Sequence, residues 1–410
     1  MTRRSADASI PLSAVSEHPH PGLVLLAFAA FIALGMPDGV LGVAWPSVRS
    51  GFGLPLDAVG LLIAASTAGY LTASFASGLL VARLEIGLLL AASCALTGAG
   101  LIGYTLVPAW WMMVLLGIAA GLGAGAIDAG LNTYAATHFS AGLMQWLHAS
   151  YGVGAALGPV TMTAALASLH SWRAGYVVIG GFQLALAVCF AFTLPVWNRT
   201  GEAVASTAPG APDSRRTPLS VTLRSRGAWL SMLLFFLYTG AEFSLGTWSY
   251  SLLTESRGIR PETAGLWAGS FWATFTAGRM AAGLYAGRAG VDRLVRGSLL
   301  AALAGALVWW WNPLPAANLV AVIVIGFALA PIFPALTTGT RHRVGLRHTA
   351  NTIGMQMAAG SLGCAFTPAL VGVLARRISL EIFPICLVVL FVTLLGLNAL
   401  AERSRARLAE

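Results

Sequence analysis

Three acidic residues and one histidine stand inside long apolar stretches of the sequence, and they are the residues best able to do chemistry. The acids are Asp38, Asp128 and Glu242, and the histidine is His148. An ionisable side chain is costly inside a bilayer and commonly marks a pathway for a proton, an ion or a solute. His148 titrates near neutral pH when unperturbed and could exchange a proton with Asp128. The sequence therefore predicts a proton-coupling site; the alternative is that each group hydrogen-bonds a neighbour for helix packing.

Amide and aromatic side chains near these acids are candidates for solute binding. Asn132 follows Asp128 by four residues and so shares its helix face. That position suits either a solute hydroxyl, the orientation of Asp128, or a hydrogen bond between helices. Aromatic rings can stack on a flat sugar face, although large residues in a bilayer protein more often pack. The other candidates for solute binding are Trp45, Trp146, Tyr151, Tyr238, Trp248, Trp272, Asn351 and Gln356.

A third set of residues is predicted to be structural or gating. Arg279 lies about two and a half helical turns before Arg288. It would either pair with an acid as a gate or extend its guanidinium to the interface. Small residues and prolines at corresponding points of two helices favour close backbone approach and hinges. This set comprises Arg279, Arg83, Arg288, Gly154, Pro159, Gly363 and Pro368.

The composition indicates a polytopic membrane protein. Of the 410 residues, 57% are hydrophobic and only 10% are charged, whereas a soluble domain carries roughly 25% charged residues. The four cysteines all fall inside apolar runs, which favours packing over a disulfide or metal framework. No phosphate loop, nucleophile triad or metal-ligand spacing occurs in the sequence. We therefore expect no enzyme, no metal and no cofactor, with a proton gradient as the energy source.

Twelve apolar runs are long enough to span a bilayer, which needs about 20 residues. They predict an all-α protein with twelve transmembrane helices in two six-helix bundles. The long polar stretch after residue 195 divides the runs equally. The predicted domains are a tail at 1–22, a bundle at 23–195, a linker at 196–227, a bundle at 228–402 and a tail at 403–410. The runs lie near 23–46, 58–81, 86–107, 110–136, 143–168, 174–195, 228–252, 263–287, 294–311, 316–339, 350–375 and 380–401.

The arginine distribution predicts the orientation of the chain in the membrane. Basic residues are retained on the cytoplasmic side. Seventeen of the 24 basic residues lie in the two tails, the linker and the even-numbered loops, which are all on one side of the membrane if the twelve runs span it. Both termini are therefore expected in the cytoplasm, and the net charge of +9 needs no nucleic-acid partner. All basic residues are arginine, which is typical of a GC-rich bacterial gene. We expect a bacterial inner-membrane protein, targeted by its first helix without a cleaved signal peptide.

An internal repeat relates the two predicted bundles. Asp38 and Gly42 recur as Glu242 and Gly246 at an offset of 204 residues. The pair Gly154 and Pro159 recurs as Gly363 and Pro368, and Gly78 with Arg83 recurs as Gly283 with Arg288. Asp128 and His148 have no ionisable counterpart, because Pro331 and Met357 take the corresponding positions. The N-terminal bundle is therefore predicted to carry most of the proton handling, and the C-terminal bundle to shape the solute site.

Two such repeats around a central site resemble the major facilitator superfamily over essentially the whole chain. The family's basic loop after the second helix survives only in part, because Ala82 stands where an acid is usual, and the loop ending at Arg288 also lacks that acid. The segments 128–132, 147–159, 238–248 and 331–334 are similar to the bypass-of-stop-codon-like group of fungi and bacteria. A more distant likeness to the fucose:proton symporters implies proton-coupled movement of a small polar solute.

The sequence thus predicts a secondary active transporter that moves a small, sugar-like polar solute by alternating access, with proton symport. Segment 154–159 partly resembles a motif of proton-coupled antiporters, so efflux of a drug or metabolite is the alternative. A membrane receptor that transports nothing is a further alternative. The expected partners are the lipid bilayer and a small-molecule substrate, and the protein is expected to be a monomer.

Overall fold

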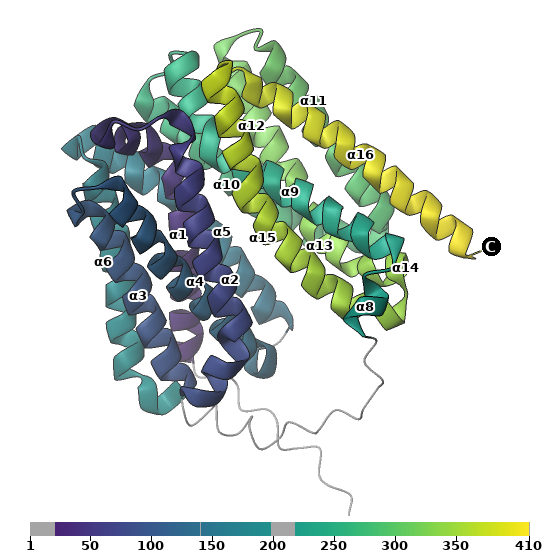
Figure 1. Cartoon of the computed structure of the whole chain (residues 1–410), viewed down its shortest axis with the longest axis horizontal. Helices are drawn as coiled ribbons and strands as arrows, with labels where there is room; N and C mark the ends of the chain where they lie inside the picture. Colours follow the sequence, from purple (N-terminus) through teal and green to yellow (C-terminus); the bar gives the residue numbers. More distant parts are fainter. Residues whose placement is uncertain (1–20, 140, 198–217, 410) are drawn as a thin grey trace, which may run out of the picture.

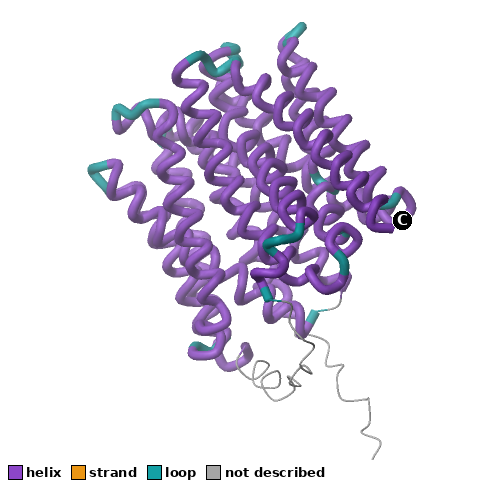
Figure 2. The backbone as a smooth tube through the Cα atoms, turned by 45° about the vertical axis from the view of Figure 1, so that its right-hand side comes forward, coloured by secondary structure: helices purple, strands orange, loops and turns teal. Residues whose placement is uncertain are grey.

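The fold is all-helical, as the sequence predicts. In a computed structural model the described residues are 21–139, 141–197 and 218–409, and they contain helices joined by short loops, without a strand (Figure 2). Most of the predicted N-terminal tail and most of the predicted linker lie outside this range. A bilayer offers the backbone no hydrogen bonds, so each spanning segment must satisfy its own polar groups, and the helix does this.

Two bundles lie side by side (Figure 1). Within each bundle, consecutive spanning helices run in opposite directions. The N-terminal half contains α1 (Pro21–Phe52), the 3-10 turn η1 (Leu56–Ala58), α2 (Val59–Arg83), α3 (Ile86–Leu106), α4 (Trp110–His138), α5 (Ala141–Leu169) and α6 (Trp172–Phe192). The C-terminal half contains α8 (Leu219–Thr222), α9 (Arg226–Ser251), η2 (Leu252–Ser256), α10 (Pro261–Ala289), α11 (Val291–Trp311), α12 (Pro315–Leu329), α13 (Ile332–Thr338), α14 (Thr340–Val344), α15 (Leu346–Arg377) and α16 (Ile382–Ala409).

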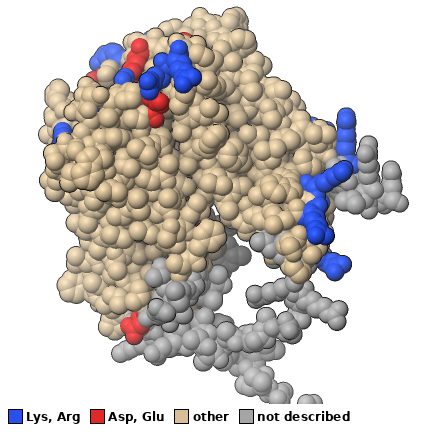
Figure 3. All heavy atoms as spheres, in the orientation of Figure 1, with Lys and Arg blue, Asp and Glu red and all other residues tan. Residues whose placement is uncertain are grey.

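Eleven spans within the described part of the chain are long and apolar enough to cross a membrane. The helix that falls short of this apolarity is α10, which lies at the eighth predicted run, is 29 residues long and carries Glu262 and Arg279. It packs against α5, α9 and α12 inside the protein, which partly shelters Arg279, whereas Glu262 is exposed in the first turn of the helix. Figure 3 shows charged side chains near the ends of the molecule and almost none across the middle of this face, as a lipid-facing belt requires.

The tenth predicted run is a broken helix. It comprises α12 and α13, with a turn at Ala330 and Pro331 between them. Pro331 and Pro334 have no N–H to donate, so neither can continue the helical hydrogen bonds. The hydroxyl of Tyr238 in α9 donates to the carbonyl of Leu329 at 3.1 Å, directly before the break. Such outside donors allow a broken helix at membrane depth.

The internal repeat is visible in how the helices cross. A Cβ added to Gly154 in α5 would lie 1.9 Å from the carbonyl oxygen of Ile32 in α1, and one added to Gly363 in α15 would lie 2.1 Å from that of Phe236 in α9. Ile32 and Phe236 are themselves related by the 204-residue offset. Only glycine permits these two backbones to touch. Both halves therefore contain the same close helix crossing.

The two halves meet at one end of the molecule. We call the end that holds the start of α1 and α8 the linker end, and the opposite end the far end. A Cβ on Gly42 would lie 2.0 Å from the carbonyl oxygen of Gly246, so these repeat-related residues touch where α1 and α9 meet. Figure 3 shows the surface hollowed between the halves towards the linker end. The halves are thus closed together at the far end and separated at the linker end.

Ion pairs reinforce the far-end closure. Arg376 at the end of α15 contacts Asp57 in η1 at 3.1 Å, and Arg49 at the end of α1 contacts Glu255 in η2. Each pair joins one half to the other. Because all four side chains are partly exposed, each pair contributes only about 0.2–1 kcal/mol. Such weak pairs stabilise the closure while leaving it reversible.

Candidate functional site

Asp38 sits near the middle of α1, facing α5. The Tyr151 hydroxyl of α5 donates a hydrogen bond to the Asp38 carboxylate. Although Asp38 lies deep within the protein, its side chain is exposed, so it borders solvent-accessible space and not a packed core. Gly35 and Gly39 bring α1 into backbone contact with α5 here. The site therefore pairs an accessible acid with a tyrosine that stabilises its charged form.

Asp128 in α4 is held by two side chains. The Tyr70 hydroxyl of α2 donates to one carboxylate oxygen at 2.5 Å, and the Asn132 amide donates to the other at 2.8 Å. Asn132 also donates to the Asp128 carbonyl at 2.9 Å, as expected for residues four apart on a helix. Of the functions considered for Asn132, these contacts favour orienting Asp128. The carboxylate is thus fixed in one direction.

His148 in α5 is exposed and faces groups from both halves. Its ring packs edge-on against Phe31, with 5.5 Å between ring centroids. Asp128 from the N-terminal half and Arg279 from the C-terminal half are its electrostatic neighbours. A position between an acid and a cation from opposite halves suits a proton relay that senses how the halves are arranged.

Glu242 in α9 is buried, with 6% of its surface exposed. Arg279 of α10 and Tyr238 are its stabilising neighbours. The Arg279 guanidinium also stacks over the Phe275 ring at 4.4 Å, a cation–π contact that helps to hold the charge in apolar surroundings. Arg279 therefore lies near an acid, while its gating role stays a prediction.

These groups form one assembly, which we call the central cluster: Asp38, Asp128, Glu242, His148 and Arg279. Asp38 is close enough to both Asp128 and Glu242 for mutual repulsion. Three acids therefore share one permanent cation, and proton uptake would relieve the excess negative charge. The cluster draws on α1, α4, α5, α9 and α10, so it includes both halves.

Four of the predicted aromatic ligands are buried and engaged in packing. The indole N–H of Trp45 donates to the Leu56 carbonyl, and that of Trp248 donates to the Pro368 carbonyl, each at 2.9 Å. Trp272 is 2% exposed and packs against other rings, while the Tyr238 hydroxyl is bonded to the break after α12. These contacts are those of scaffold residues, and a solute role for them stays a prediction. The Pro368 carbonyl takes part in one of these packing contacts, and its predicted structural or gating role stays a prediction.

The remaining predicted ligands lie in two places. Trp146 in α5 is 58% exposed, and so has a face available. The Asn351 amide donates to the Thr222 hydroxyl of α8 at 3.0 Å, and the Gln356 amide oxygen accepts from the Thr340 hydroxyl of α14 at 3.0 Å. Both amides therefore brace the linker end of the C-terminal half, away from the central cluster.

Two gating candidates and one unpredicted residue complete the comparison with the sequence. Arg83 ends α2 and Arg288 lies in the last turn of α10, but their side chains fall outside the described part. Tyr70 was not predicted, although it is bonded directly to Asp128. Its signal is a single large polar residue among the mostly small residues of segment 64–76, a pattern that indicates close approach to another helix.

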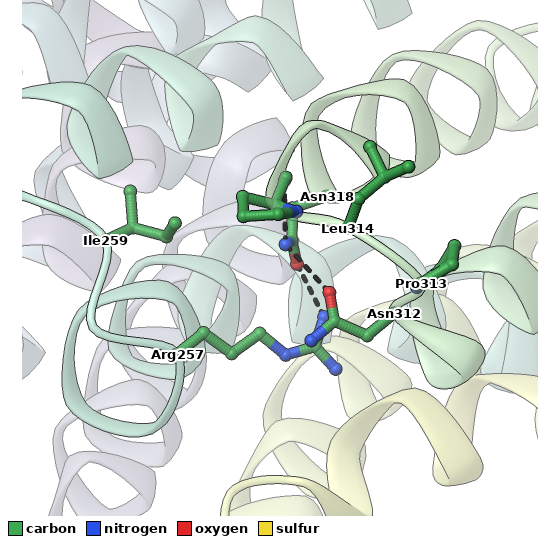
Figure 4. A pocket seen from close by; sticks show the side chains of 7 residues that line it. Arg257, Ile259, Asn312, Pro313, Leu314 and Asn318 are labelled. Atoms are coloured by element: carbon green, nitrogen blue, oxygen red, sulfur yellow. Dashed lines mark hydrogen bonds between the residues drawn. The ribbon is translucent and has the colours of Figure 1, made fainter.

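A buried arginine braces the far end of the C-terminal half, apart from the central cluster. Arg257 donates to Glu381 through two nitrogens, at 3.0 and 2.7 Å, to Asn318 at 2.5 Å and to the Trp309 carbonyl at 3.0 Å. Figure 4 shows it beside a cavity of about 180 Å³ that is also lined by Asn312. All three guanidinium nitrogens of Arg257 donate to protein groups. Arg257 therefore stabilises the fold beside this cavity and is not positioned to bind a ligand in it.

Comparison with known proteins places the chain in a family. The family model described as Major Facilitator Superfamily matches residues 23–368. Bypass of stop codon protein 6 of Saccharomyces cerevisiae is 27% identical over 173 residues, which span 40% of this chain and 35% of that protein, or about a third of its length. Sodium-dependent glucose transporter 1A of Mus musculus is 25% identical over 386 residues, which span 85% of this chain and 88% of the mouse protein.

Solved structures share the fold at low sequence identity. A bacterial homologue of the human lysosomal transporter Spinster, in an inward-facing and occupied conformation, gives a TM-score of 0.77 at 14% identity, over 95% of this chain and 98% of that chain. The nucleoside transporter NupG, in a mutant form, gives 0.77 at 12% identity, over 93% of this chain and 99% of that chain. With its spanning helices in two related halves and a matching family model, this chain belongs to the major facilitator superfamily and is a multi-pass membrane transporter, not an enzyme.

Proposed function

We propose that this protein is a proton-coupled secondary transporter of a small, sugar-like polar solute. The observation that carries the proposal is the central cluster, where three acids face one arginine between the two halves. Such a set is expensive in a bilayer and is commonly retained where protons or solutes pass. A purely structural cluster would balance its charges, whereas this one has two more acids than arginines.

The transport cycle follows from the closed far end and the open linker end. With the linker end in the cytoplasm, as the arginine distribution predicts, this arrangement is the inward-facing state. Rocking the halves to part Asp57 from Arg376 and Gly42 from Gly246 would open the site to the opposite side. A ligand shifts such an equilibrium only through different affinity for the two states, and the central cluster contacts both halves, so its protonation meets that condition.

Within the cluster the residues take different roles. Asp128 is the main proton carrier, because Tyr70 and Asn132 orient it and His148 lies beside it. Asp38 is accessible and carries a second proton or contacts the solute. Glu242 keeps Arg279 as its electrostatic neighbour and supports the site from the C-terminal half. This division places proton handling in the N-terminal half.

The solute class rests on the available polar groups and on two related proteins. Carboxylates, Asn132 and the tyrosine hydroxyls favour a partner rich in hydroxyl groups. The mouse protein is named for glucose and NupG for nucleosides, and both of those solutes contain a sugar ring. A thermal-shift screen of sugars, polyols, nucleosides, organic acids and drugs would identify ligands, because a ligand that binds the native state raises its apparent stability.

The decisive test measures uptake of the identified solute into proteoliposomes under a pH gradient. Asp128→Asn keeps the shape of the side chain but cannot carry the proton, so we expect solute exchange to persist and gradient-driven accumulation to fall at least about tenfold, near the lower edge of what allosteric couplings span. Glu262→Gln removes an exposed acid at the start of α10, whose ion pair with Arg260 lies within one half; it is the matched control and should retain accumulation. Accumulation by Asp128→Asn equal to wild type would remove Asp128 from coupling.

Two further arms test the coupling ion and the direction. A sodium gradient without a pH gradient should drive no accumulation; if it does, the coupling ion is sodium. Proton flux accompanying solute addition should follow the solute in the same direction. Proton movement opposite to the solute would instead establish the efflux antiporter that segment 154–159 allows.

A further inference from the structure

The short stretch between the linker and α9 carries an exposed patch of mixed chemistry. We call it the α8 patch: Val221, Leu223, Arg224, Arg226 and Trp229. Val221 is 46% exposed, Leu223 41% and Trp229 54%, and both arginines are exposed as well. Three apolar side chains and two cations thus share one surface at the linker end of the C-terminal half, where α8 lies in Figure 1.

The patch is fixed in place from behind. Thr222, between its first two members, is fully buried, and its hydroxyl contacts the His348 ring at 3.1 Å and accepts from the Asn351 amide at 3.0 Å. The Trp229 indole N–H donates to the Leu223 carbonyl at 2.8 Å, which holds the ring over the turn. The buried side of this turn is therefore anchored to α15, while its apolar and basic groups point outward.

The outward side has the chemistry of a membrane-surface contact. Among the ion pairs of the described residues, none involves Arg224 or Arg226. A guanidinium fork matches the oxygens of a phosphate group, and tryptophan favours the headgroup region of a bilayer. Aliphatic side chains beside them would reach the upper acyl chains. Basic residues next to a membrane helix are attracted to anionic lipids specifically.

We propose that the α8 patch binds anionic phospholipid headgroups and, through Thr222, ties the linker end of α15 to the membrane surface. This inference is independent of the solute and of the coupling ion. Its consequence reaches the transport machinery, because α15 packs against α2 of the other half. Lipid charge would thereby stabilise one helix of the interface between the halves.

The test titrates phospholipid into the full-length protein in neutral detergent and follows the thermal unfolding midpoint. Phosphatidylglycerol should raise the midpoint at lower concentration than phosphatidylcholine. A basic residue near an anionic surface contributes about fivefold in affinity, so Arg224→Gln with Arg226→Gln should require about 25 times more phosphatidylglycerol and leave the phosphatidylcholine response unchanged. Arg293→Gln with Arg296→Gln removes two other exposed arginines near the linker end and should have a smaller effect.

Each remaining arm can overturn one part of the proposal. If phosphatidylglycerol and phosphatidylcholine raise the unfolding midpoint equally, the α8 patch does not bind anionic headgroups and the proposal is refuted. This is the result expected if another segment of the chain covers the patch. An equal effect of the two double variants would show a diffuse charge effect without a defined site. A rise with soluble glycerol phosphate would indicate a free-anion site. Thr222→Val should leave the half-saturating lipid concentration unchanged but reduce the rise in unfolding temperature; a full rise would exclude the link to α15.

Discussion

Gly42→Ala tests whether the far-end contact between the halves belongs to the transport cycle. A Cβ at this position would lie 2.0 Å from the Gly246 carbonyl oxygen across the interface, and real Cβ atoms essentially never approach another heavy atom closer than 3.0 Å. The helices α1 and α9 would therefore have to separate by roughly 1 Å, the kind of backbone shift that overpacking forces on a well-packed core. That separation is needed only while the far end is closed, so the change favours the state open at the far end.

The magnitude follows from the cost of overpacking, which is about 1–3 kcal/mol. At about 1.4 kcal/mol per tenfold, the ratio of far-end-closed to far-end-open molecules would fall about 5- to 150-fold. Alanine also stabilises a helix relative to glycine by about 0.5–1 kcal/mol, but this gain is the same in both states and cancels. A population that is half closed in the wild type would therefore fall below about one sixth.

Spin labels would be placed on the far-end loops of the two halves, at Pro108 and Pro313. A larger population open at the far end would appear as a longer distance between the labels in double electron–electron resonance. Gly181→Ala is the matched control, because that α6 glycine has open space where a Cβ would be placed and should leave the distances unchanged. A Gly42→Ala protein with the wild-type distance distribution would refute the idea that the glycine contact closes the far end.

Two further predictions concern charges at the far end. Asp57→Arg should open the far end by like-charge repulsion with Arg376, and adding Arg376→Asp should restore the wild-type spin-label distances; failure of this rescue would mean that the pair has no part in closure. Hydrogen bonds from Arg257 hold the pKa of the Glu381 carboxyl, in a far-end loop, below its usual range. A lowered pKa adds stability above the unfolded-state value of about 4.3, which is lost as the pH falls through the folded-state value. Glu381→Gln should therefore lower the free energy of unfolding by about 1 kcal/mol at pH 7, a modest amount because the carboxylate is partly exposed. In thermal unfolding, the stability difference between wild type and variant should narrow below about pH 4; a difference that does not change with pH would contradict this.

The number of long helices and the two-fold repeat could be predicted from the sequence, because both follow from the order of apolar and polar residues along the chain. The apolar runs marked the helices, and Gly42 with Gly246 matched at a constant offset. For Arg279 the sequence left two roles open, pairing with an acid or extending its guanidinium to the interface, and the fold places it near Glu242. It could not indicate that Tyr70 holds Asp128, since that contact depends on how α2 packs against α4.

The solute candidates were the least predictable part of the site. A tryptophan in an apolar helix has the same local pattern whether it packs or binds. Trp45 and Trp248 proved to be bonded to backbone carbonyls, which only the fold reveals. Asn351 was predicted from its amide chemistry alone, yet it contacts the end of the linker. Pro331 did carry a local signal, because two prolines three residues apart cannot continue a helix, but the run was predicted as a single helix.

The contact between Gly42 and Gly246 also has a mechanical consequence. From residue 42 to the start of α1 at residue 21, a helix rising about 1.5 Å per residue extends about 31 Å. If α1 swings about this contact as a lever, a rotation of about 10° moves its linker end by about 5 Å, roughly one helical turn. The missing side chains thus set a fulcrum near one surface, and a small rotation about it becomes a displacement of about 5 Å at the opposite mouth.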